Sequence, residues 1–64
     1  GFDFEANKAM VLQEMKEEYS ELSEVSQEEL RKMVQDDAGW MNIFLDKLFG
    51  RVIEYDPEAC LVPE

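Results

Sequence analysis

The chain has 64 residues, of which 16 are acidic and 6 are basic, giving a formal net charge of −10 at pH 7. Nucleic acid and anionic membrane surfaces would be repelled by this charge, so we expect neither as a partner. The length allows one domain at most, and the 45% content of hydrophobic residues favours a folded chain over a disordered one.

A single core is only marginally stable at this length, and small domains are usually reinforced by disulfides, a metal or another chain. Cys60 is the one cysteine and histidine is absent, which excludes an intrachain disulfide and a Cys/His zinc site. We therefore expect no cofactor, and we expect association with another protein or a second copy. The lack of a disulfide framework favours a reducing compartment, the cytoplasm or the nucleus. Because the first residue is Gly1 rather than methionine, we expect a fragment of a larger protein.

A first amphipathic helix is predicted over residues 4–22, with Asp3 placed to cap its opening turn. Three-, four- and seven-residue spacings put six apolar side chains on one stripe: Phe4, Val11, Leu12, Met15, Tyr19 and Leu22. The opposite face carries like-charged residues one turn apart: Glu14, Glu17, Glu18 and Glu21. This acidic face is either a solubilising surface or a docking patch for a protein rich in Lys and Arg.

A second helix is predicted over residues 27–36. Ser26 and Glu29 have the spacing of a capping box, and Val25 and Leu30 can pack across the turn as a hydrophobic staple. The inward residues of this short helix are expected to be Leu30, Met33 and Val34.

A third helix is predicted over residues 38–49, capped by Asp37 and ended by Gly50. Seven of the ten positions from 40 to 49 are apolar: Trp40, Met41, Ile43, Phe44, Leu45, Leu48 and Phe49. On a helix they sweep roughly 240° of the circumference, and two neighbouring helices rarely cover that much. We expect this helix to be the hydrophobic centre of the fold and to leave part of its apolar surface for another chain.

The remaining residues, 51–64, are predicted to be extended. The run from Arg51 to Tyr55 suits a short strand or an arm, and both Pro57 and Pro63 oppose continuation of a helix. The predicted fold is therefore all-α, a single small three-helix bundle over residues 1–64 with an extended C-terminal arm.

Catalytic and metal-binding patterns are weak in this sequence. Without histidine, neither a Ser/His/Asp nor a Cys/His arrangement can form, and paired carboxylates would need a cleft that so small a bundle can hardly provide. The acidic alternation from Glu54 to Glu58 fails as a calcium loop, because its sixth position is Ala59 where glycine is required. We therefore predict no enzymatic activity, no metal site and no small-molecule substrate.

The segment Tyr19-Ser20-Glu21-Leu22-Ser23, taken with Leu30 and Met33, resembles the opening of helical domains in endosomal-sorting coiled-coil subunits. The resemblance covers residues 19–33 and implies only a capped helical pair; no function is carried over from it.

Two functions remain as hypotheses. The first is a docking, adaptor or oligomerisation module that binds a partner through the third helix and the arm after it. Its predicted partner-binding residues are Trp40, Met41, Phe44, Leu45, Leu48, Phe49, Val52 and Tyr55. The second is an acidic inhibitor or nucleic-acid mimic that presents the carboxylates of the first helix and of the C-terminal tail to a basic protein.

Overall fold

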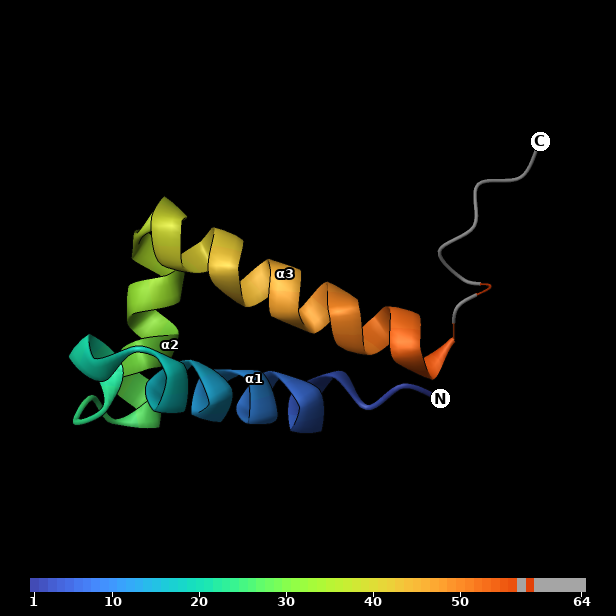
Figure 1. Cartoon of the computed structure of the whole chain (residues 1–64), viewed down its shortest axis with the longest axis horizontal. Coiled ribbons are helices and arrows are strands. Elements are labelled where there is room, and N and C mark those ends of the chain that lie inside the picture. Colours follow the sequence, from blue (N-terminus) through green and yellow to red (C-terminus); the bar gives the residue numbers. More distant parts are fainter. Residues whose placement is uncertain (57, 59–64) are drawn as a thin grey trace.

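The computed structural model describes residues 1–56 and 58. These residues form helix α1 (Phe4–Glu18), a 3₁₀ turn η1 (Ser20–Leu22), helix α2 (Gln27–Asp36) and helix α3 (Ala38–Tyr55). In Figure 1, α1 and α3 run lengthwise in opposite directions, and α2 crosses between them at one end of the molecule. The prediction of a small all-α, three-helix bundle is confirmed.

All three predicted N-terminal caps are present. The Asp3 carboxylate accepts a hydrogen bond from the Ala6 amide at 3.0 Å, and the Ser26 hydroxyl accepts one from the Glu29 amide at 3.2 Å. Asp37 caps α3 more extensively, because its Oδ1 accepts from the amides of Gly39 at 2.8 Å and Trp40 at 3.4 Å. Each cap satisfies donors that the first helical turn leaves free.

The first helix is shorter than predicted, because α1 ends at Glu18 and not at Leu22. Tyr19 is extended, with φ −112° and ψ 112°, and the chain then makes the 3₁₀ turn. This break turns the Tyr19 ring edge-on to Trp40, with ring centroids 5.3 Å apart, and carries Leu22 into the core, where it is 1% exposed. The gain in packing outweighs the hydrogen bonds of one further helical turn, on which like-charged glutamates would repel each other.

The third helix is longer than predicted, because α3 passes through Gly50 and ends at Tyr55. Gly50 does not adopt the positive φ of a helix-ending glycine, and the prediction that Arg51 to Tyr55 are extended is wrong. A glycine inside a helix costs only about 1 kcal/mol, and the bonds of Arg51 to Asn7 and Glu14 of α1 favour continuation of the helix past it. The helix stops at Asp56, the residue before Pro57, where proline disfavours helical backbone. The rest of the predicted arm, 57 and 59–64, lies outside the described residues.

The hydrophobic core lies mainly on α1 and α2, and not on α3 as predicted. Its buried side chains are Val11, Leu12, Met15, Leu22, Leu30, Val34 and Leu48, so α3 contributes a single fully buried residue among those described. Four further apolar residues of α3 are only partly buried against this core: Trp40, Met41, Ile43 and Phe44. The most apolar helix therefore keeps much of its apolar surface at the outside of the protein.

Candidate protein-interaction surface

The eight residues predicted to bind a partner divide into an inner and an outer group. Leu48 is in the core at 9% exposure, and Trp40, Met41, Phe44 and Val52 are partly buried. The outer group consists of Leu45, Phe49 and Tyr55, with exposed fractions of 48%, 56% and 59%. Only this outer group has enough free surface for a partner to gain by covering it.

Leu45 and Phe49 of the outer group belong to an exposed apolar strip, which we define as Phe4, Leu45, Phe49 and Ile53. On α3, Leu45, Phe49 and Ile53 follow at four-residue intervals and so lie on one face of the helix. Phe4 comes from the first turn of α1 and is 52% exposed. A shallow hollow of about 380 Å³ adjoins the strip, and its lining residues are Phe4, Leu45, Asp46, Leu48, Phe49 and Val52.

Aromatic side chains continue this apolar surface towards the end of α3. The Phe2 ring lies edge-on to Phe4 at 4.8 Å between centroids and edge-on to Tyr55 at 5.4 Å. Such edge-to-face pairs are favourable beyond the area they bury. Phe2 therefore connects the N-terminal segment to the last turn of α3 and holds Phe4 next to that helix.

Phe4 and Ile53 are not among the residues predicted from the sequence to bind a partner. Ile53 has a local signal, since it falls one helical turn after Phe49, but only if the helix continues past Gly50. Phe4 was assigned to the buried stripe of the first helix on its spacing. No sequence signal places it beside α3, since that position depends on how the two helices pack.

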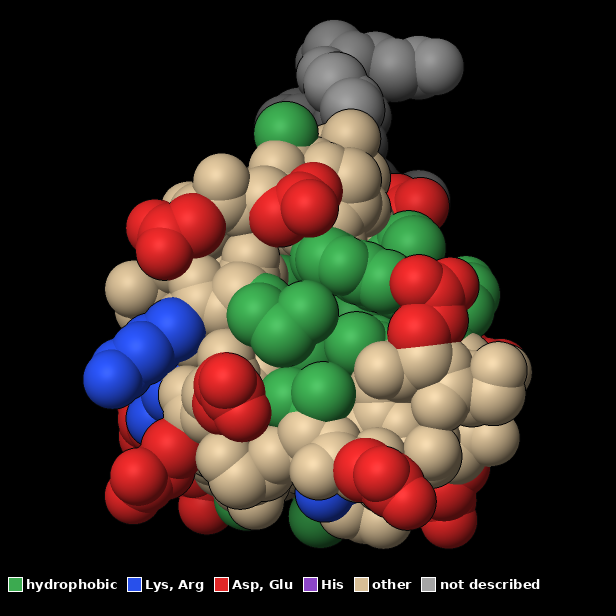
Figure 2. All heavy atoms as spheres, turned by 90° about the vertical axis from the view of Figure 1, so that its left-hand side faces the viewer, with side chains coloured by type: hydrophobic (Ala, Val, Ile, Leu, Met, Phe, Trp, Pro, Cys, Tyr) green, Lys and Arg blue, Asp and Glu red, His purple; other side chains and the backbone are tan. Residues whose placement is uncertain are grey.

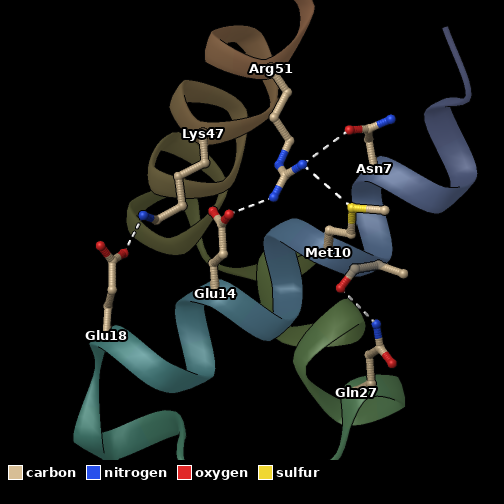
Figure 3. A network of polar contacts seen from close by, with 8 residues as sticks. Asn7, Met10, Glu14, Glu18, Gln27, Lys47 and Arg51 are labelled. Atoms are coloured by element: carbon tan, nitrogen blue, oxygen red, sulfur yellow. Dashed lines mark hydrogen bonds and ion pairs between the residues drawn. The ribbon is translucent and has the colours of Figure 1, made fainter.

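On the other side of α3, a polar network fixes this helix against α1 (Figure 3). Arg51 bonds to the Glu14 carboxylate, and its second terminal nitrogen reaches Asn7 Oδ1 at 3.3 Å and Met10 Sδ at 3.4 Å. One turn earlier, Lys47 forms an ion pair with Glu18. Lys47 and Arg51 lie four residues apart and both meet carboxylates of α1, so they fix the rotation of α3 and leave Leu45, Phe49 and Ile53 on another side of the helix.

The Lys47–Glu18 pair also changes the titration of the lysine. Its hydrogen bond to Glu18 raises the pKa of the Lys47 ammonium above the usual value of 10.5, and nearby negative charge acts in the same direction. Partial burial opposes this rise in pKa but does not cancel it. Lys47 is therefore charged throughout the physiological range, and its charge is directed at α1 and not at the strip.

A second region of mixed character lies at the α2 end of the molecule. Partly buried apolar side chains here include Tyr19, Val25, Met33 and Trp40. Viewed from this end, apolar side chains gather at the centre of the face with Asp and Glu side chains around them (Figure 2). Trp40, one of the residues predicted to bind a partner, packs here against Tyr19 and lies about three and a half turns of α3 away from Ile53.

No helix within residues 1–56 and 58 combines the length and apolar character needed to cross a membrane. The same residues contain no group of three or more Asp, Glu, Cys or His side chains placed to hold a metal ion. No protein-family model, curated protein or solved structure matches the chain.

Proposed function

We propose that the protein is a non-catalytic interaction module that binds another protein through the apolar strip of α3 and α1. The observation that carries the proposal is the exposure of three large apolar side chains, Leu45, Phe49 and Ile53, on one face of α3. Exposed aromatic and aliphatic residues that share one face are typical of helix-mediated protein interfaces. In a 64-residue chain, covering them would also stabilise the fold.

The pairing of the α1 carboxylates favours this function over the acidic mimic. Glu14 and Glu18 lie on the face that the mimic would present, but they bond to Arg51 and Lys47 of the same chain. Their charge is thus largely neutralised within the protein. A binding mode based on the strip keeps all of these internal pairs intact, whereas a mimic would have to compete with them. The single cysteine supports a reducing compartment, which we take to be the cytoplasm.

Site-specific photocrosslinking tests the proposal. A photoreactive phenylalanine at position 49 is compared with the same residue at position 13, an exposed glutamine on α1, in extracts of the source cells. We expect a protein partner to be crosslinked from position 49 and not from position 13. That partner, once purified, should bind the wild-type chain and fail to bind Phe49→Ser.

Salt dependence provides the control against the mimic. At about 1 M salt, where the Debye length is near 3 Å, binding through the strip should persist. Equal crosslinking from both positions, or complete release of the purified partner by salt, would contradict the proposed function.

A further inference from the structure

The hollow beside the strip has two walls from different helices. Leu45, Phe49 and Val52 of α3 form one wall, Phe4 of α1 stands opposite, and Leu48 lies at the core side. Ile53 lies eight positions after Leu45, which is about 12 Å along the helix axis at 1.5 Å per residue. A surface of this length between two antiparallel helices is suited to a third helix laid along them, with residues one turn apart as anchors.

The charge around this hollow is negative. Asp46 is the only charged residue among those described that line it, and Asp3 and Glu5 flank Phe4 in sequence and are exposed. Asp56, also exposed, follows the last residue of α3.

The nearby cations do not offset this negative charge. Lys47 and Arg51 are directed at the carboxylates of Glu18 and Glu14 on the far side of α3. Lys8, one turn along α1 from Phe4, is paired with Glu5 at 3.3 Å. Lys8 therefore compensates Glu5, whereas Asp3, Asp46 and Asp56 form no ion pair with a Lys or Arg among the described residues.

From these observations we infer that the partner of the strip is a cationic amphipathic helix, whose apolar face covers the strip and whose flanking Lys and Arg side chains meet the acidic edges. This inference rests on the proposed function and adds the chemistry of the partner. Apolar contact would supply most of the affinity, and the charges would supply orientation and faster association.

Two other occupants are disfavoured by the same charges. A second copy would bring two chains of net charge −10 together, with both copies of Asp46 at the edges of one interface. The chain's own segment 57–64 contains Glu58 and Glu64 and no Lys or Arg, so it does not complement the acidic edges either.

The experiment uses two synthetic helices of equal length with the same leucine face, one with lysines and one with glutamates on the polar face. Each is titrated into the full chain in reducing buffer by isothermal calorimetry. We expect the lysine peptide to bind at least about tenfold more tightly than the glutamate peptide, which corresponds to about 1.4 kcal/mol. Phe49→Ser should abolish binding of the lysine peptide.

A pair of charge-matched variants locates the effect. Asp46→Asn should weaken binding of the lysine peptide about two- to fivefold, which is within the effect of a single exposed ion pair. Asp36→Asn removes one carboxylate at the C-terminal end of α2. It should leave the affinity for the lysine peptide unchanged. Far-UV circular dichroism confirms that each variant is folded.

The outcomes separate this inference from the function on which it rests. Equal binding of the two peptides, or equal effects of Asp46→Asn and Asp36→Asn, overturns the cationic partner and leaves the interaction module standing. If the chain is a dimer in sedimentation equilibrium and Phe49→Ser dissociates it, the occupant of the strip is a second copy. This result also overturns the cationic partner. Failure of both peptides to bind a monomeric chain overturns the inference, while crosslinking from position 49 still decides the proposed function.

Discussion

Arg51 of α3 bonds to Glu14 of α1 across 37 positions of sequence, and this pair links the two longest helices. The same guanidinium also reaches Asn7 and Met10, so one side chain contacts three successive turns of α1. Both partners are only partly buried, with side-chain exposures of 27% for Arg51 and 42% for Glu14. Solvent screening therefore limits what the pair contributes to stability.

Replacing Arg51 by methionine should lower the free energy of unfolding by about 1 kcal/mol, since methionine keeps the apolar stem and loses the polar contacts. Lys8→Met is the matched control, because it also changes the net charge by one unit and breaks an exposed pair with Glu5. We expect its cost to stay below about 0.5 kcal/mol. Urea denaturation followed by circular dichroism measures both, and equal losses would show that net charge alone matters.

The stability that Lys47 contributes should depend on pH. Its pKa is raised in the folded protein by the hydrogen bond to Glu18, so the folded state holds this proton more tightly than the unfolded state. The contribution is thus fully present below 10.5, the unfolded value, and is lost as pH rises through the higher folded pKa. The stability difference between wild type and Lys47→Met should therefore be constant from neutral pH to about 10 and shrink above it.

Glu18→Gln is the control for this pH dependence, because it removes the carboxylate that raises the pKa of Lys47. In the Glu18→Gln background, the Lys47→Met substitution should show little change in its effect across the same alkaline range. Comparing each variant with its own parent cancels the contributions of groups that both proteins share. If the pH dependence persisted without Glu18, the cause would be another group.

Gly50→Ala should stabilise the protein by about 0.5–1 kcal/mol, because glycine in a helix interior loses more backbone entropy than alanine on folding. The substitution has room, since a Cβ built at Gly50 meets nothing within 4 Å. Gly39→Ala is the matched control in the first turn of α3. Its Cβ would lie 3.2 Å from the Asp37 carboxylate that caps the helix, so its gain should be smaller or reversed. Thermal unfolding of the two variants gives the comparison.

The helix starts could be predicted from sequence because the interactions that fix them are local. Asp3, Ser26 and Asp37 each bond to amides two or three residues ahead, so a short window of sequence contains both partners. The end of α3 is different. The glycine signal at Gly50 is local and small, whereas the contacts that hold Arg51 in the helix reach residues 37–44 positions earlier.

The candidate surface could be predicted only as an excess of apolar residues on the third helix. Which of them face outwards depends on the rotation of α3, and that rotation follows from Lys47 and Arg51 meeting carboxylates of α1. A sequence pattern gives neither the pairing nor the resulting direction of Leu45 and Phe49. Phe4 joins the strip because α1 and α3 run side by side in opposite directions (Figure 1), which is a tertiary relationship.

Leu48 and Leu45 test the division of α3 into an inner and an outer face, because both are leucines in one turn of the same helix. Leu48 packs in the core, and Leu48→Ala should cost about 2–4 kcal/mol. Leu45 is 48% exposed, and Leu45→Ala should change the free energy of unfolding by less than about 0.5 kcal/mol. If Leu48→Ala leaves too little folded protein to measure, Leu48→Met gives a smaller loss in the same direction.

Partner binding should depend on the outer face of α3 and not on the stability of the core. Leu45→Ala removes part of the strip, so the protein should bind the leucine-faced lysine peptide more weakly while its own free energy of unfolding stays the same. Val34→Ala, a core substitution on α2 outside the hollow, should lower the free energy of unfolding and leave binding of that helix unchanged. A loss of stability in Leu45→Ala as large as that in Leu48→Ala would show that the strip is structural, and the outer face of α3 would then have to be covered within the chain itself.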